Sequence, residues 1–282
     1  MECLHIWFEN WKMKKIKVGI IGCGTIGGAI AKACQNVLAG SIDLIAICDI
    51  DKEKAFQLAM TLKGKVPVLG MSELIKKSGL VVEAASASVS AKVLSSCVSA
   101  KRDCLIMSVG GLIGKEKLLA RAMAIGVRVY IPSGAISGID GLKSAMAGGV
   151  TSVTLTTRKP PKGLLGAPYL KDNYIDLSNI SGETVVFEGS VEDAVKGFPQ
   201  NVNVSAVLSI AGIGAKKTKV RIVTSPEYTG NVHEIEVMGV SGKITTRTEN
   251  VPSATNPKTS ALAIFSAIAT LRSAASSVRI GT

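Results

Sequence analysis

Short runs of β-branched residues alternate with helical periods through the first half of the chain. The first run, Ile16–Ile21, leads into a helical period at Ile26, and the alternation continues as far as Ile131. Such alternation is typical of parallel strands joined by crossover helices. We therefore predict an α/β fold built on one Rossmann-type doubly wound parallel sheet. The expected strands are 16–21, 43–48, 66–68, 80–83, 104–108 and 127–131, and the expected helices are 26–38, 52–62, 71–77, 89–100 and 115–125.

The character of the sequence changes after Pro132. Five glycines fall between positions 134 and 149, and the later β-branched runs alternate apolar with polar residues, as half-exposed antiparallel strands do. Ser190, followed by Asp193 three positions on, predicts a capped helix start. We therefore expect a second, α+β domain with a mixed sheet. Its expected strands are 152–158, 184–187, 219–223, 232–240 and 243–249, and its expected helices are 191–197 and 203–211.

The last part of the chain predicts a long helix. Asn256 is a natural N-cap, Pro257 suits the first helical position, and an Ala-rich run continues to about Ser276. Because nearly all of this helix surface is small and apolar, we expect the helix to pack on the first domain. The chain then divides into a first domain of residues 14–132 plus 256–282 and a second of residues 133–255. We interpret residues 1–13 as an extension of doubtful function.

A Gly-x-Gly-x-x-Gly pattern occupies residues 22–27, between the first strand and the first helix, which is the context that gives the pattern meaning. Gly22 allows a tight turn, Gly24 lets the backbone approach a pyrophosphate, and Gly27 lets helix and strand pack closely. Together with Thr25 and Ile26, these glycines place N–H donors at a helix amino terminus, where an anion binds. The pattern predicts a dinucleotide site.

Asp49 strengthens this interpretation, because it ends the second expected strand and lies 22 residues after Gly27. An acidic side chain there can accept hydrogen bonds from both adenosine ribose hydroxyls. It would repel the 2′-phosphate of NADP, although Lys52 is close enough to soften that repulsion. We therefore favour NAD and leave NADP open. Ala85 and Ser86, after the fourth expected strand, are small enough to face a flat ring, or they form an ordinary turn.

Composition narrows the class of protein further. The net charge of +12 favours anionic ligands, but only 4% of residues are aromatic and none interleaves the basic run at 216–221, which argues against nucleic acid. Six cysteines fall in the first 104 residues without a Cys-x-x-Cys pair, so we expect buried thiols in a reducing cytoplasm and no metal. No apolar run reaches the ~18 residues of a membrane span, so we expect no membrane partner.

His233 is the one histidine outside the first dozen residues, and so the natural candidate for a group that titrates near neutral pH. The strand period places it on the same face as Ile235 and Val237. A lone histidine on an apolar face is also a common core residue, and the residues alone leave both interpretations open. Lys159 and Lys258 are cations available to the carboxylates of a substrate, or are solvated surface lysines.

Several stretches, in this order, resemble the L-aspartate dehydrogenases of prokaryotic NAD synthesis. They are 22–27, 132–140, 159–162, 185–190, 198–204, 231–233 and 256–260. The resemblance covers nearly everything after Met13. It implies that His233 is the catalytic residue, that Ala135 and Asn201 contact the cofactor, and that the second domain serves for substrate binding and dimerisation. In the 198–204 stretch we take Asn203 as a further candidate substrate contact, beside Lys159 and Lys258.

The reaction implied is oxidation of L-aspartate by NAD to iminoaspartate. A base such as His233 would deprotonate the substrate amine or activate the water that later attacks the imine; the sequence leaves this choice open. The resemblance also implies a homodimer and a hand-over of the imine to quinolinate synthase. Two alternatives remain: a related dehydrogenase or reductase of another amino or hydroxy dicarboxylate, and a non-catalytic NAD-sensing protein.

Overall fold

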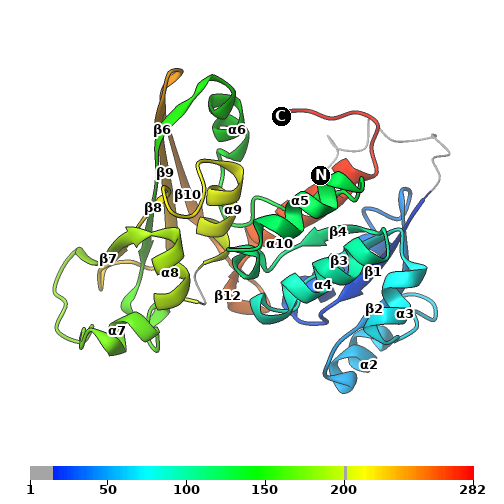
Figure 1. Ribbon diagram of the computed structural model, residues 1–282. Coiled ribbons are helices and arrows are strands. Elements are labelled where there is room, and N and C mark those ends of the chain that lie inside the picture. The colour runs from blue at the N-terminus through cyan, green and yellow to red at the C-terminus, as the bar shows by residue number, and fades with distance from the viewer. Residues whose placement is uncertain (1–14, 200–201) are drawn as a thin grey trace.

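The computed structural model describes residues 15–199 and 202–282, which form two five-stranded sheets and one two-stranded sheet (Figure 1). The first sheet has the strand order β2-β1-β3-β4-β5, and each pair of neighbours is parallel. This order, with the crossover helices, confirms the Rossmann-type parallel sheet. The strands are β1 (Ile16–Ile21), β2 (Ile42–Cys48), β3 (Leu80–Glu83), β4 (Asp103–Ile106) and β5 (Val129–Tyr130). The strand expected at 66–68 is reduced to one bridge between Ile47 and Val68.

Helices cover both faces of the first sheet and bury its apolar strands. On one face, Ile30 of α1 and Leu58 of α2 join the core, and on the other Leu94 of α4 and Ala122 of α5 do so. Burial on both faces explains why these strands are continuous apolar runs. The helices are α1 (Thr25–Gln35), α2 (Lys52–Thr61), α3 (Met71–Lys77), α4 (Ala87–Ser99), η1 (Val109–Leu112) and α5 (Glu116–Ala124).

The second sheet is mixed, as expected, with the order β10-β9-β6-β8-β7. Strands β6 and β8 are parallel, and the other pairs are antiparallel. One face packs on helices through Leu155, Ile235 and Leu208, while the opposite face carries polar side chains such as Glu234. The strands are β6 (Val150–Lys159), β7 (Thr184–Ser190), β8 (Lys219–Thr224), β9 (Asn231–Gly239) and β10 (Gly242–Asn250).

The helices of the second unit include two that match their expected bounds. These are α8 (Val191–Gly197) and α9 (Asn203–Ala211), and Ser190 Oγ accepts from Asp193 N at 3.2 Å, as the capping pattern predicts. The others are α6 (Ile139–Gly148), α7 (Pro168–Asp172) and the short η2 (Pro161–Gly163). Helix α6 was not expected, because its glycines indicate a loop. Gly138 and Gly149 adopt positive φ just outside its two ends, and they bound the helix rather than break it.

The prediction that Asn256 caps a helix beginning at Pro257 is wrong. Residues Asn256–Ser260 form β12, which pairs with β11 (Pro252–Ser253), and helix α10 (Ala261–Ala274) starts afterwards. Ser260 is the cap, because its Oγ accepts from Leu262 N at 3.1 Å. The fixed φ of proline suits the start of an extended segment as well as the start of a helix. Helix α10 returns to the first sheet, where Ala267 and Leu271 are buried (Figure 1).

Across residues 15–199 and 202–282, no helix combines the length and the apolar character of a membrane span. In the same described ranges, no three His, Cys, Asp or Glu side chains are grouped so that they would hold a metal ion.

Candidate active site

The loop between β1 and α1 has the geometry that a dinucleotide pyrophosphate needs. Gly22 has φ of +102°, and a Cβ there would lie 2.4 Å from the Ala84 carbonyl oxygen. A Cβ at Gly27 would lie 1.8 Å from the Gly22 carbonyl oxygen, so only glycine fits. At Gly24, by contrast, a Cβ would meet nothing within 4 Å, which leaves open space for a ligand. No side chain caps the amino terminus of α1, so its first N–H groups face that space. These residues fit a dinucleotide.

Asp49 lies against this loop, directly after β2. Its Oδ2 accepts from the Cys23 N–H at 2.7 Å, and its Oδ1 accepts from the Asp51 N–H at 2.9 Å. Each oxygen keeps further lone pairs for ribose hydroxyls. The structure therefore brings Asp49 to the loop, in the position that the sequence predicts.

Glu83 is a site residue that the sequence analysis missed. It is fully buried at the end of β3, where its Oε1 accepts from Ala85 N at 2.8 Å and from Ser108 Oγ at 2.9 Å. Its Oε2 accepts from Ser108 N at 3.0 Å, and burial raises the pKa of the carboxyl group. One carboxylate thus fixes the loops that follow β3 and β4, including exposed Ala85 and Ser86. The available signal was an acidic residue that ends a buried apolar run.

A cavity of about 230 Å³ opens between the two sheets. Residues from the first unit, from the segment after β5, from the second sheet and from β12 meet around it. It brings together five of the residues singled out from the sequence: Ile26, Ala135, Lys159, Asn203 and His233. It is also lined by Met107, Val109, Pro132, Gly134, Val204, Val207, Asn231, Thr259, Ser260 and Ala263. Asp49, Ala85 and Ser86 are not part of this lining. Asn201 and the side chain of Lys258 lie outside the described residues.

His233 lies on the inner face of β9 with Ile235 and Val237, as the strand period predicts. It pairs with Thr157 of β6, and its Nδ1 is 3.0 Å from the Thr157 hydroxyl oxygen. Only 5% of the side chain is exposed. Burial, with a smaller contribution from the charge of Lys159, lowers the pKa of His233 to about 3. The imidazole is therefore neutral at physiological pH, and Nε2 is the ring nitrogen left for a ligand.

Lys159 is the last residue of β6 and lies on the same face, two positions beyond Thr157. It is a diagonal neighbour of His233 across the two strands, within reach of a long side chain. Its side chain is 9% exposed, and burial lowers its pKa to about 8. The two titratable groups that line the cavity are both shifted toward their neutral forms.

Asn203 and Ala135 connect the units around the cavity. Asn203 Oδ1 accepts from the Gly110 N–H at 3.0 Å, which joins α9 to η1, and its amide NH₂ is a separate donor group. The Ala135 carbonyl accepts from Asn250 Nδ2 at 2.9 Å, and the N–H of Gly134 donates to Ser266 of α10 at 3.1 Å. The cavity walls are therefore cross-linked by hydrogen bonds between distant segments.

A Rossmann-type sheet with a phosphate loop, next to a cavity that a second mixed sheet also lines, is typical of dinucleotide-dependent oxidoreductases. Residues 140–274 match the family model described as aspartate dehydrogenase, C-terminal, and residues 22–132 match that of the homoserine dehydrogenase NAD binding domain.

Comparison with individual proteins gives the family. The chain is 47% identical to the L-aspartate dehydrogenase of Methanosarcina mazei, over 95% of this chain and 100% of that protein. It is 40% identical to the L-aspartate dehydrogenase of Nitrosopumilus maritimus, over 94% of this chain and 99% of that protein. The crystal structure of aspartate dehydrogenase from Thermotoga maritima is similar, with a TM-score of 0.74 and 29% sequence identity. The match covers 95% of this chain and 100% of that chain. The chain belongs to the aspartate dehydrogenase family, which confirms the resemblance stated above.

Proposed function

We propose that this protein oxidises L-aspartate to iminoaspartate with NAD as the hydride acceptor, and that NADP is a possible substitute. The observation that carries the proposal is the cavity, because it joins Ile26 of the phosphate loop to buried His233 and Lys159. The L-aspartate dehydrogenases that match this chain along nearly its whole length support the same reaction. Residues 14–132 plus 256–282 would form the cofactor domain, and residues 133–255 the substrate and dimerisation domain.

The proposed cofactor site begins at the phosphate loop. Gly22, Gly24, Thr25, Ile26 and Gly27 would hold the pyrophosphate at the start of α1, where the N–H groups are uncapped. Asp49 would accept hydrogen bonds from the adenosine ribose, and Ala85, Ser86, Ala135 and Asn201 would make further contacts. When bound, NAD supplies the acceptor for the hydride that leaves the substrate α-carbon.

The substrate is a dicarboxylate, and we propose Lys159, Lys258 and Asn203 as the residues that contact it. Lys159 and Asn203 line the cavity, and Lys258 precedes Thr259, which also lines it. Cationic side chains and an amide NH₂ are suitable donors to carboxylate oxygens. This space would lie between the two proposed domains, and exclusion of water from it would protect the imine from hydrolysis.

His233 contributes a fixed, neutral imidazole. Thr157 orients the ring through Nδ1, so Nε2 can hydrogen-bond the substrate amine or the water that attacks the imine. Because the pKa of His233 is lowered to about 3, the ring does not retain a proton at neutral pH. Its catalytic part is to hold the reacting nitrogen or oxygen in place.

We also propose a homodimer, cytoplasmic localisation and hand-over of the imine to quinolinate synthase. The polar outer face of the second sheet, which includes Thr154, Arg221 and Glu236, is a surface that a second copy of the chain could cover. Iminoaspartate that is not handed over would hydrolyse to oxaloacetate and ammonia.

The test is nicotinamide absorbance with purified protein, L-aspartate and NAD or NADP at alkaline pH. Two variants of one position sharpen it, because His233→Gln places an amide nitrogen near the position of Nε2, whereas His233→Asn places one near Nδ1. We expect His233→Asn to lose about 10²-fold of kcat, because misplacement of a reacting group costs on that order, and His233→Gln to lose less. Far-UV circular dichroism checks that both fold.

Three results would revise the proposal. Equal kcat in wild type and both variants would make His233 a core residue. Absence of turnover with either cofactor, but turnover of another amino or hydroxy dicarboxylate, would change the substrate. NAD binding without turnover of any dicarboxylate would favour an NAD-sensing protein.

A further inference from the structure

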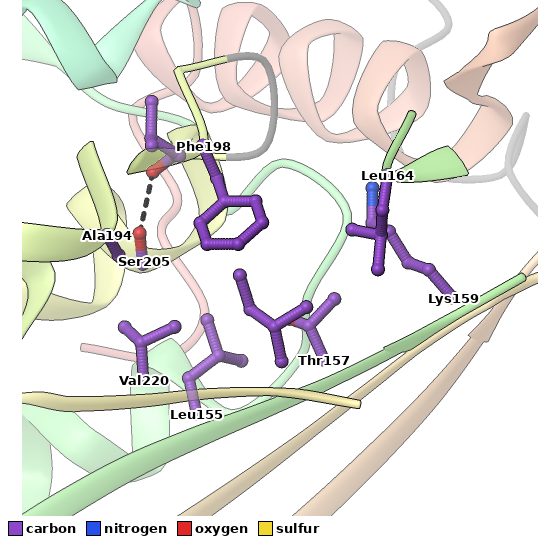
Figure 2. Close-up of a pocket in the computed structure, with 10 residues that line it drawn as sticks. Leu155, Thr157, Lys159, Leu164, Ala194, Phe198, Ser205 and Val220 are labelled. Atoms are coloured by element: carbon purple, nitrogen blue, oxygen red, sulfur yellow. Dashed lines mark hydrogen bonds between the residues drawn. The ribbon is translucent and has the colours of Figure 1, made fainter. Parts of the chain in front are cut away.

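The end of β6 places a largely buried lysine beside the cavity. Lys159 lines both the 230 Å³ cavity and a smaller pocket of about 10 Å³. The small pocket is walled mainly by apolar side chains, among them Leu164 and Phe198, with Thr157 and Ser205 as polar members (Figure 2). A space of that size holds about one water molecule. A hydration shell for an ammonium group does not fit on this side.

The stem of Lys159 is held as well as buried. Helix η2 covers it so closely that a Cβ on Gly163 would lie 3.8 Å from both Cβ and Cδ of the lysine. The backbone is fixed too, because the Lys159 carbonyl accepts from the Thr224 hydroxyl at 2.8 Å. The amine therefore reaches the cavity from a rigid strand end rather than from a mobile surface chain.

Among the described residues, the charged groups around Lys159 are few. His233 of β9 is the titratable group that faces it, and α9 carries no titratable side chain. Lys162 on η2 is exposed, and Arg158 points to the opposite face, toward Glu234. Helix α8 presents Ala194 and β8 presents Val220 and Ile222. The charged residues of those two elements are not part of the pocket lining: Glu192, Asp193, Lys196, Lys219 and Arg221.

The proposed oxidation needs a proton acceptor that the histidine does not provide. Hydride leaves the α-carbon only when the nitrogen lone pair is free, so the substrate ammonium must first lose a proton. A general base works best when its pKa is near the operating pH. The pKa of His233, about 3, is far below that range, whereas the pKa of Lys159, about 8, lies within it.

We propose that Lys159 is the catalytic base that takes the proton from the substrate ammonium group, while neutral His233 holds the same nitrogen in place. This inference rests on the proposed aspartate oxidation and specifies its first step. The lone pair of the neutral Lys159 amine bonds to one ammonium proton, which leaves a neutral substrate amine and a Lys159 ammonium.

The second step then balances. With NAD bound as the acceptor, the electron pair of the α-C–H bond would leave as hydride, and the substrate nitrogen lone pair would form the C=N bond of an iminium product. The charge that Lys159 gains is offset by the carboxylates of a dicarboxylate substrate, which compensates for its burial. Lys159 returns its proton to solvent when the product leaves.

The kinetic test compares Lys159→Arg, Lys159→Met and a matched control, Lys162→Arg, three positions away and exposed. Arginine keeps the positive charge but stays protonated. If Lys159 is the base, both Lys159 variants lose about 10²- to 10⁴-fold of kcat, while NADH binding, followed by its fluorescence, stays within twofold of wild type. The Lys162→Arg control retains kcat. In a further variant, Lys159→Ala, added methylamine or ethylamine should restore part of kcat, and the restored fraction should increase with pH.

A second readout does not depend on turnover. In unliganded protein labelled with ¹³C at lysine Cε, the signal that disappears in Lys159→Arg should titrate near pH 8, well below the other lysines. If that signal titrates above pH 10, the inference is wrong. It is also wrong if Lys159→Arg keeps kcat and only raises KM, because Lys159 would then be a carboxylate-binding cation. If wild type itself oxidises no L-aspartate with either cofactor, the proposed function fails first and the base role with it.

Discussion

The phosphate loop and the catalytic wall are built in different ways. The loop is made by six consecutive residues, 22–27, whose backbone conformation and missing Cβ atoms are written directly in the sequence. The wall gathers Lys159, His233 and Asn203 from three elements. The register of β6 and β9 brings the lysine and the histidine together, and helix α9 adds the asparagine. Substitutions in the loop should therefore act through the volume that they add. Substitutions in the wall should act through changes in burial and in hydrogen bonds between distant segments.

The largest effect is expected at Gly27. An alanine there would place Cβ 1.8 Å from the Gly22 carbonyl oxygen, so backbone must move. We expect the free energy of unfolding of Gly27→Ala to fall by more than the ~1–3 kcal/mol typical of overpacking. We also expect the variant to lose NADH binding. Thermal unfolding and NADH fluorescence measure the two effects.

Two neighbouring glycines serve as controls for that variant. Gly28→Ala puts its Cβ in ordinary contact with Leu58, at 3.5 Å, and should be close to wild type in stability and binding. Gly24→Ala meets no protein atom and should keep its stability but bind NADH more weakly, since the Cβ enters the ligand's space. If Gly27→Ala were as stable as Gly28→Ala, the loop would have room for a Cβ atom at position 27, and this prediction would be wrong.

The same contrast explains what the sequence could predict. The parallel sheet, the phosphate loop and Asp49 follow from local patterns and strand order, because each depends on residues close in the chain. Helix α6 was missed because glycines that end a helix and glycines that break one look alike before φ is known. The strand at Asn256–Ser260 was missed because its partner, β11, is visible only in the fold.

Within the site, residue identity was easier to predict than chemical state. Lys159 and His233 were candidates from the sequence, but their burial, and hence their neutral forms, follows from packing against α9, η2 and β8. Glu83 was not singled out, since its role depends on Ser108, 25 residues away. Long-range burial and long-range hydrogen bonds are the two properties that a single sequence leaves open.

The second prediction concerns the pH dependence of stability that the buried amine of Lys159 causes. Lys159 has a pKa of about 8 when folded, against 10.5 for an ordinary lysine, so between these values the unfolded chain binds more protons than the folded one. The free energy of unfolding must therefore rise with pH across that window. The contribution of Lys159 amounts to ~3 kcal/mol over the whole window, and Lys159→Met should lack it.

Urea unfolding of wild type and Lys159→Met between pH 7 and pH 10.5 measures this difference. Lys162→Met is the matched control and should follow wild type. Parallel pH dependence in wild type and Lys159→Met would mean that the amine is hydrated in solution, and it would weaken the contrast between wall and loop.

The smallest effect is expected at Asn203, where one side chain serves both packing and ligand contact. Its Oδ1 accepts from the Gly110 N–H at 3.0 Å, and its NH₂ group is a donor beside the cavity. Asn203→Asp keeps the acceptor and removes the donor, whereas Asn203→Ala removes both. We expect Asn203→Ala to lose about 0.5–1.5 kcal/mol of unfolding free energy and Asn203→Asp to lose less, while both raise KM for the substrate. Equal stability losses would mean that the bond to Gly110 does not join the units. An unchanged KM in Asn203→Asp would remove Asn203 from the substrate contacts and leave it as a cross-link alone.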